Sequence, residues 1–204
     1  VYYYVRHPKS ARVVELFERV VKAAEAAALG TGTSVTYEVM HGNYPLLPNE
    51  TLARLVDGNL RNLGGFLYDD AERQFAHTIR TTLGDDLPAI DSTNEVAPFA
   101  ITQGMGSTDV GDVSWNVPTV GFRTATWVPG TPAHSWQAVA AGGTSIGHKG
   151  MGLAAKLIAR TAQDLIENPE IIDEARAELK EKQGADFEYK ALLGDREPPL
   201  DYRL

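Results

Sequence analysis

Apolar residues recur at helical spacing along much of the chain. From Ser10 to Gly30 they fall on every third or fourth position, with a serine that can cap the start and a glycine that can end the helix. This pattern predicts an amphipathic helix, because residues three and four apart share one helix face. The same spacing predicts further helices over residues 49–64, 70–83, about 145–168 and from 169 onward.

Other stretches are rich in β-branched and aromatic residues, which favour strands. They are residues 1–5, 34–40, 112–118 and 121–128. Together with the helices, they predict an α/β fold. Because a strand needs neighbours to satisfy its backbone and to bury one face, we expect the opening strand to pair with a segment outside this chain.

An irregular stretch, residues 41–48, interrupts these periodicities with prolines and a glycine. Such residues end regular structure, so we predict a domain boundary here, with residues 1–44 and 45–204 as the two domains. A second irregular stretch, residues 84–111, carries many Ser, Thr, Gly and acidic residues. It is too long for a simple connector, and long loops of this kind often carry functional sites.

Composition narrows the possible functions. The chain has 204 residues, of which 43% are hydrophobic and 23% charged, and this balance is typical of a folded globular protein. Its net charge of -8 opposes binding to nucleic acid, and it has no run of roughly 20 apolar residues that would span a membrane. Cysteine is absent, so a metal would need His and carboxylate ligands. We expect a cytoplasmic protein without nucleic-acid or membrane partners.

Three short runs carry the strongest functional signal. They are GSTDVGDVSW at residues 106–115, TPAHSWQ at residues 131–137 and SIGHKGM at residues 145–151. In this order the runs resemble the aminoacylase and glutamate-carboxypeptidase family of dinuclear-zinc amidohydrolases, in particular its members that act on p-aminobenzoyl-glutamate. Each run alone is a weak signal, whereas the ordered combination is specific.

The resemblance implies roles for particular residues. His134 corresponds to the family's last metal ligand, on one of two divalent metal ions, zinc or alternatively manganese. Ser107, Thr108 and Asp109 correspond to the loop that lines the substrate pocket, and Arg6 corresponds to a lid residue that binds the substrate carboxylate. Each has a structural alternative: a hydrogen-bonded loop histidine, a solvated turn, and an arginine that protects a strand edge.

Further histidines carry weaker signals. His41 lies at the proposed hinge, where packing is the simpler interpretation. His148 stands beside Lys149 at the start of a predicted helix, where it is either a second site residue or a structural group, and we favour the structural alternative. His77 falls within a predicted helix and receives no role.

The family's remaining metal-binding motifs are absent from the chain: an early His-x-Asp pair, a bridging Asp, and a Glu-Glu pair whose first Glu is the general base. The resemblance therefore implies a carboxy-terminal portion, namely the end of a zinc-peptidase catalytic domain attached to half of a ferredoxin-like α+β dimerisation lid. Alone, this portion should be inactive. We expect the missing amino-terminal half or a partner subunit to supply the rest, and a homodimer to form through the lid.

The reaction implied by the resemblance is hydrolysis of the amide bond between an acyl or aroyl group and an amino acid, with p-aminobenzoyl-glutamate as the suggested substrate. One alternative is a non-catalytic interaction subunit that keeps the fold without a full metal site. A weaker alternative is a small-molecule-binding α/β domain unrelated to amide hydrolysis. Metal content and the effect of replacing His134 would separate these functions.

Overall fold

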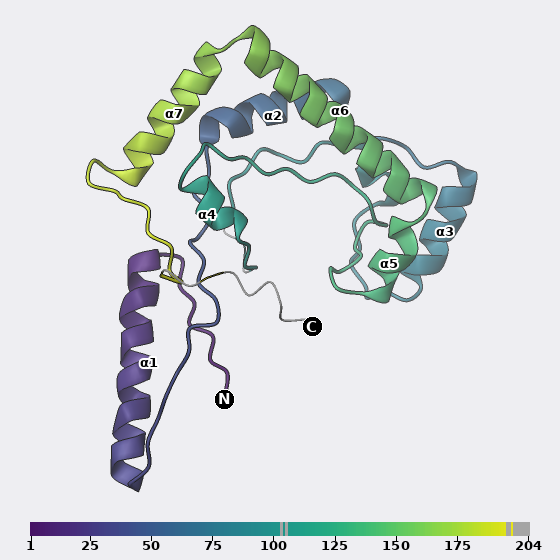
Figure 1. The fold of residues 1–204 in the computed structure, drawn as a ribbon. Helices are drawn as coiled ribbons and strands as arrows, with labels where there is room; N and C mark the ends of the chain where they lie inside the picture. Colours follow the sequence, from purple (N-terminus) through teal and green to yellow (C-terminus); the bar gives the residue numbers. More distant parts are fainter. Residues whose placement is uncertain (103, 105, 195–196, 198–204) are drawn as a thin grey trace. The chain divides into compact units, whose positions relative to one another are not determined.

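The structure is a computed structural model that describes residues 1–102, 104, 106–194 and 197. The regular elements within these residues are all helices (Figure 1). The elements in chain order are α1 (Ser10–Thr31), α2 (Glu50–Leu63), α3 (Asp70–Arg80), the 3-10 helix η1 (Ile90–Asn94), α4 (Val110–Ser114), α5 (Trp136–Gly142), α6 (Ser145–Glu167) and α7 (Glu170–Gln183). The helices that the hydrophobic spacing predicts are all present. No described helix is long and apolar enough to cross a membrane.

The predicted α/β fold is wrong, and so are the zinc-peptidase sheet and the half ferredoxin-like lid, because no described residue lies in a strand. The predicted strands over residues 1–5, 34–40 and 121–128 are irregular, and residues 112–114 belong to α4. Aromatic and β-branched residues stabilise a strand only where a neighbouring strand and a surface to bury are present. Here Tyr2 is 84% exposed and Tyr37 is 63% exposed, so these side chains have no sheet surface against which to pack.

Two compact units divide the chain. Unit 1 comprises residues 1–47, 103–119 and 179–204, as far as they are described, and unit 2 comprises residues 48–102 and 120–178. The boundary between residues 178 and 179 falls within α7. The division into a lid half and a catalytic portion at residue 44 stays a prediction.

Unit 2 has a hydrophobic core. Its central cluster consists of Tyr68, Ala76, Ile79, Val128 and Ile146, each no more than 4% exposed. Ala76 and Ile79 are three residues apart on α3, so the same helix face carries both into the core. Helix α6 also packs against α2 and α5. This core holds the segment around Val128, next to which the candidate site is built.

Polar side chains fix two helix starts in unit 2. Asn49 caps α2 by accepting a hydrogen bond from the Leu52 amide at 3.0 Å. Asp69 and Glu72 form a capping box at the start of α3, in which each side chain accepts from the other residue's backbone amide. Caps of this kind stabilise a helix by about 1 kcal/mol because they satisfy amides that have no partner within the helix.

Unit 1 contains the long helix α1, in which no residue is buried. The Phe17 ring contacts the Tyr37 ring edge-on, with 5.8 Å between centroids. Gly32 ends the helix with a φ of 68°, a left-handed conformation that glycine adopts without steric cost. The end therefore falls two residues beyond the predicted Gly30. This helix follows its local sequence pattern without a surrounding core.

Helix α4 anchors the 44–47 segment within unit 1. The Asp112 carboxylate accepts hydrogen bonds from the Tyr44 amide at 3.1 Å and from the Tyr189 hydroxyl at 2.9 Å. The fully buried Ser114 accepts from the Leu47 amide at 2.9 Å, and the Trp115 indole donates to the Pro45 carbonyl at 2.8 Å. The second half of the GSTDVGDVSW run therefore has a structural role.

Candidate functional site

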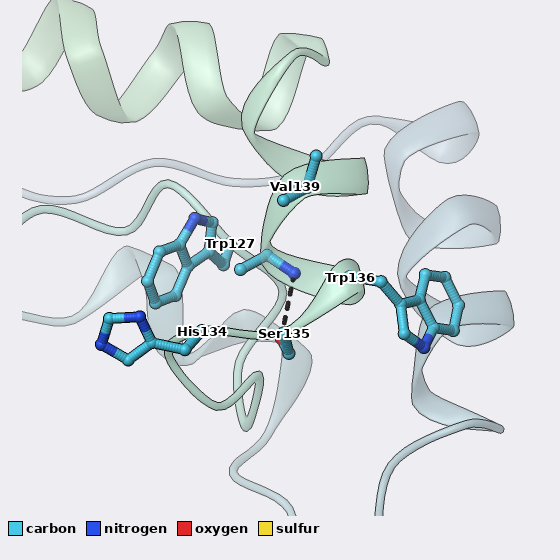
Figure 2. A pocket seen from close by; sticks show the side chains of 6 residues that line it. Trp127, His134, Ser135, Trp136 and Val139 are labelled. Atoms are coloured by element: carbon cyan, nitrogen blue, oxygen red, sulfur yellow. Dashed lines mark hydrogen bonds between the residues drawn. The ribbon is translucent and has the colours of Figure 1, made fainter. Parts of the chain in front are cut away.

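Unit 2 carries a pocket of about 420 Å³ at the start of α5. Its lining comes from the segment before α5 and from the first turn of that helix (Figure 2). The lining residues are Trp127, His134, Ser135, Trp136, Ala138 and Val139. Two indoles and two aliphatic side chains make the lining mostly apolar, with an imidazole as its one titratable group.

The loop before α5 is shaped by its own hydrogen bonds. The Ser135 hydroxyl donates to the Pro132 carbonyl at 2.7 Å and accepts from the Ala138 amide at 3.2 Å, so Ser135 is the N-cap of α5. Gly130 has a φ of 91°, and a Cβ at this position would lie 2.6 Å from Leu87 Cδ2. The turn therefore requires glycine. These constraints fix the path of the chain on both sides of residue 134.

His134 has a left-handed backbone conformation with a φ of 59°. Histidine enters this region more readily than most non-glycine residues, but the conformation still has a cost, and such strain is concentrated at functional sites. The side chain is exposed, and its ring lies beside the Trp127 indole (Figure 2). It makes no hydrogen bond within the described chain. Both ring nitrogens are therefore open to a ligand.

A complete metal site is not formed by the described residues, since they include no group of three or more His, Cys, Asp or Glu side chains that could hold an ion. A zinc centre in a protein usually has at least three protein ligands. The described chain therefore does not fit a dinuclear centre by itself. The donor chemistry of His134 suits one ligand position, and the remaining ligands would have to come from elsewhere.

The predicted substrate loop, Ser107 to Asp109, precedes α4 in unit 1, and all three side chains are exposed. The Thr108 hydroxyl accepts a hydrogen bond from the Val110 amide at 3.2 Å. This contact shapes the turn into α4. Because His134 belongs to unit 2, the predicted position of this loop beside it stays a prediction.

Arg6 also belongs to unit 1 and is exposed. Its guanidinium carbon lies 5.7 Å from the centroid of the Tyr4 ring, which is the geometry of a cation–π contact. The predicted strand edge that it would protect is not present, since residues 1–5 are not in a strand. Its predicted role in binding a substrate carboxylate stays a prediction.

The SIGHKGM run supplies packing and an ion pair at the start of α6. Gly150 lies against the chain at Ala125, where an added Cβ would come 2.2 Å from the carbonyl oxygen. The Lys149 ammonium donates to the Leu67 carbonyl at 3.1 Å and pairs with the Glu72 carboxylate. His148 is exposed. Packing and an ion pair therefore account for Gly150 and Lys149, whereas the structural role favoured for His148 stays a prediction.

Glu72 is the more deeply buried member of this ion pair, with 4% exposure, compared with 36% for Lys149. Burial by itself would raise the pKa of Glu72, but the hydrogen bonds from the Lys149 ammonium and the Asp69 amide, together with the nearby Ser145 side chain, outweigh it and hold the pKa below its usual value. Oε1 of Glu72 has no hydrogen-bond partner within the described chain, whereas Oε2 accepts from both the Lys149 ammonium and the Asp69 amide. The carboxylate therefore stays charged at neutral pH.

Sequence reasoning missed Trp127. The indole is 37% exposed and forms a wall of the pocket beside His134 (Figure 2). A sequence signal was available, since a tryptophan shortly before a Pro-Gly turn, itself close to the histidine, can stay partly exposed. The interpretation of residues 121–128 as a strand gave this side chain no role in a site.

Two curated relatives of the chain are hydrolases, and they confirm its resemblance to the aminoacylase and glutamate-carboxypeptidase amidohydrolases. The chain is similar to a subunit of the p-aminobenzoyl-glutamate hydrolase of Escherichia coli (strain K12), with 36% identity over an alignment 203 positions long; the match covers 87% of this chain and 42% of the relative. It is also similar to the Xaa-Arg dipeptidase of Mus musculus, with 29% identity over an alignment 182 positions long; the match covers 87% of this chain and 35% of the relative.

The chain spans less than half the length of both relatives, since it covers 42% of one and 35% of the other. No family model matches the sequence. No solved structure matches it either.

Proposed function

We propose that this chain is part of an amidohydrolase that cleaves the bond between an acyl or aroyl group and an amino acid, with p-aminobenzoyl-glutamate as the first substrate to test. The main observation behind this proposal is the geometry of His134, the histidine to which the resemblance assigns a metal. It is exposed, has a left-handed backbone conformation and lines a pocket of about 420 Å³. The similarity to two hydrolases of amide bonds supports the same conclusion.

The proposed cofactor is a pair of divalent metal ions, zinc or manganese, and bound metals of this kind supply Lewis-acid chemistry to amide hydrolysis. His134 would hold one of them. The other ligands and the general-base Glu would come from outside the described residues. Arg6 would bind the free carboxylate of the substrate, and Ser107, Thr108 and Asp109 would line the pocket.

A second polypeptide portion is part of the proposal. The bacterial relative is named as one component of a hydrolase with more than one kind of chain, and both relatives are more than twice as long as the segment matched here. We therefore propose that the activity belongs to an assembly with a partner chain or to a longer chain. We also propose that two copies of the protein associate and that the protein is located in the cytoplasm. A non-catalytic interaction subunit is the alternative, and the metal content of the complete protein would distinguish the two.

The test uses the complete protein together with any other chain that copurifies with it. Release of p-aminobenzoate from p-aminobenzoyl-glutamate and the bound metal per chain are both measured for the wild type, for His134→Asn and for His148→Asn. Asparagine tolerates a positive φ, so it removes the imidazole while keeping the backbone conformation. The matched control, His148, is exposed on α6.

We expect His134→Asn to lower kcat/KM at least 100-fold and to reduce bound metal. Replacing a residue that only hydrogen-bonds to a metal ligand already lowers metal affinity or activity by about 10- to 100-fold. His148→Asn should change neither quantity. Normal hydrolysis and normal metal content in His134→Asn would show that His134 is not a metal ligand. Absence of hydrolysis and of metal in the wild-type assembly would favour the non-catalytic alternative.

A further inference from the structure

We propose that Trp127 is a specificity-determining residue whose indole face binds the planar, aromatic acyl group of the substrate beside His134. The inference rests on the proposed function and adds to it the part of the substrate that this pocket accepts. Its basis is the way in which the fold holds Trp127 and the chemistry of the pocket lining.

The backbone around Trp127 is held from three directions. Its carbonyl accepts a hydrogen bond from the Tyr68 hydroxyl at 3.3 Å. The next residue, Val128, is 1% exposed in the core, and Ala125 lies against Gly150 so closely that an added Cβ would come 2.2 Å from its carbonyl oxygen. The indole itself is 37% exposed. A tryptophan with an anchored backbone and an open face is a preorganised platform for a ligand.

Tyr68 remains a hydrogen-bond donor throughout the physiological range. Its side chain is 4% exposed. Burial, together with the nearby charge of Glu72, raises the pKa of Tyr68 to about 12. The hydroxyl is therefore protonated, and the contact that holds the Trp127 carbonyl persists at neutral pH.

The lining selects between the two halves of an acyl-amino acid. It contains aromatic and aliphatic side chains, His134 and Ser135, but no Lys or Arg. The Ser135 hydroxyl is already engaged at the start of α5. A carboxylate favours a cationic fork, which this pocket lacks, whereas a flat aromatic ring gains from stacking on an indole. The pocket therefore suits the aroyl half and not the amino-acid half.

Trp136 provides a matched contrast in the same pocket. It is 60% exposed at the first position of α5. Its indole points away from His134 and Trp127 (Figure 2). Replacing it removes the same kind of side chain from the same surface without removing the face next to His134. A non-specific effect of losing an exposed tryptophan would appear in both variants.

The kinetic experiment compares two substrates of the complete protein that differ only in the acyl group, p-aminobenzoyl-glutamate and N-acetyl-glutamate. We expect Trp127→Leu to reduce the ratio of their kcat/KM values by about 3- to 10-fold, the size of an aromatic pair interaction. Trp127→Phe should retain most of the preference because it keeps an aromatic face. Trp136→Leu, at a lining residue whose indole points away from His134, should lower the ratio less than Trp127→Leu does. Equal losses on both substrates, or the same loss in Trp136→Leu, would overturn the proposal while hydrolysis itself stands.

A binding experiment separates this inference from the proposed function. The neutral probe 4-aminobenzamide is titrated into the full chain, and the indole N–H signals of the three tryptophans are followed by NMR, with assignments from single Trp→Phe variants. A shift confined to Trp127 supports an aromatic site even if no hydrolysis is found. The proposed aromatic site is overturned if the Trp127 indole signal does not shift. It is also overturned if that signal shifts more with arginine amide than with 4-aminobenzamide.

Discussion

The two units use their apolar residues in opposite ways. In unit 2, Val128, Ile146 and Leu157 are fully buried, whereas α1 in unit 1 has no buried residue across its 22 positions. The tyrosines of the opening segment are 74–84% exposed. Both regions contain apolar sequence at helical spacing, so local pattern decides whether a helix forms, and the number of elements that meet decides whether it is buried.

This difference bears directly on the candidate site. The pocket at His134 belongs to unit 2, whose core anchors Trp127 through Tyr68 and Val128. Arg6 belongs to the region without a comparable core. The geometry beside His134 is therefore set by contacts within unit 2.

The largest effect is expected from the ion pair between α3 and α6. Lys149→Met leaves the 4% exposed Glu72 carboxylate without its cation. We expect the free energy of unfolding to fall by about 2–3 kcal/mol, below the value for a fully buried pair because Lys149 is partly exposed. Urea unfolding followed by circular dichroism measures it. The double variant Glu72→Gln/Lys149→Met should recover most of the loss, and failure to do so would show that the pair is not its cause.

The same pair predicts a dependence of stability on pH. The pKa of Glu72 is lowered in the folded state, so its contribution is present above the unfolded-state pKa and is lost as pH falls through the folded-state pKa. The stability difference between wild type and Lys149→Met should therefore be full at about pH 7 and should shrink on acidification below about pH 4. Parallel urea titrations at several pH values measure it. A constant difference across this range would contradict the assignment.

Two glycines on α6 give the next test of how tightly unit 2 is packed. An added Cβ at Gly150 would lie 2.2 Å from the Ala125 carbonyl oxygen, whereas Gly152 has no atom within 4 Å of that position. Gly150→Ala should destabilise the protein by about 1–3 kcal/mol through overpacking. Gly152→Ala should stabilise it by about 0.5–1 kcal/mol, since alanine is the better helix former. Thermal melts of the two variants should shift in opposite directions, and equal shifts would contradict the close packing at Gly150.

The helices could be predicted from sequence because their information is local. Asn49 caps α2 as predicted, and Asn168 and Pro169 separate α6 from α7. The strands could not be predicted correctly, because residues 1–5 and 34–40 have strand-forming side chains but no ladder in the described chain. Whether a strand forms depends on a neighbour that the segment does not encode.

The candidate site was only partly predictable. His134 follows from a resemblance that the relatives confirm, but its metal role stays a prediction. Trp127 had a sequence signal in the Pro-Gly turn that follows it, but the contacts that anchor the backbone around it, from Tyr68 and at Gly150, come from far away along the chain. Asp112 was interpreted as part of a strand, whereas its carboxylate joins two distant segments of unit 1.

A smaller effect is expected at the Asp112 carboxylate. Tyr189→Phe removes the hydroxyl that donates to Asp112 at 2.9 Å, on a half-buried side chain. We expect a loss of about 0.5–1 kcal/mol, the net value of one hydrogen bond near the surface. Hydrogen exchange should become faster at the Tyr44 amide, which donates to the same carboxylate. Unchanged exchange at Tyr44 would show that the two contacts are independent.

The smallest effect is expected in the opening segment, and it tests the contrast between the units most directly. Tyr3 is 74% exposed, so Tyr3→Ser removes almost no buried surface. We expect the free energy of unfolding of the isolated chain to change by less than about 0.5 kcal/mol, as is usual for exposed positions. Urea unfolding of Tyr3→Ser beside Lys149→Met gives both values on one scale. A loss at Tyr3 as large as that at Lys149 would mean that the opening segment is buried in solution, and the contrast between a cored unit and an uncored one would no longer hold.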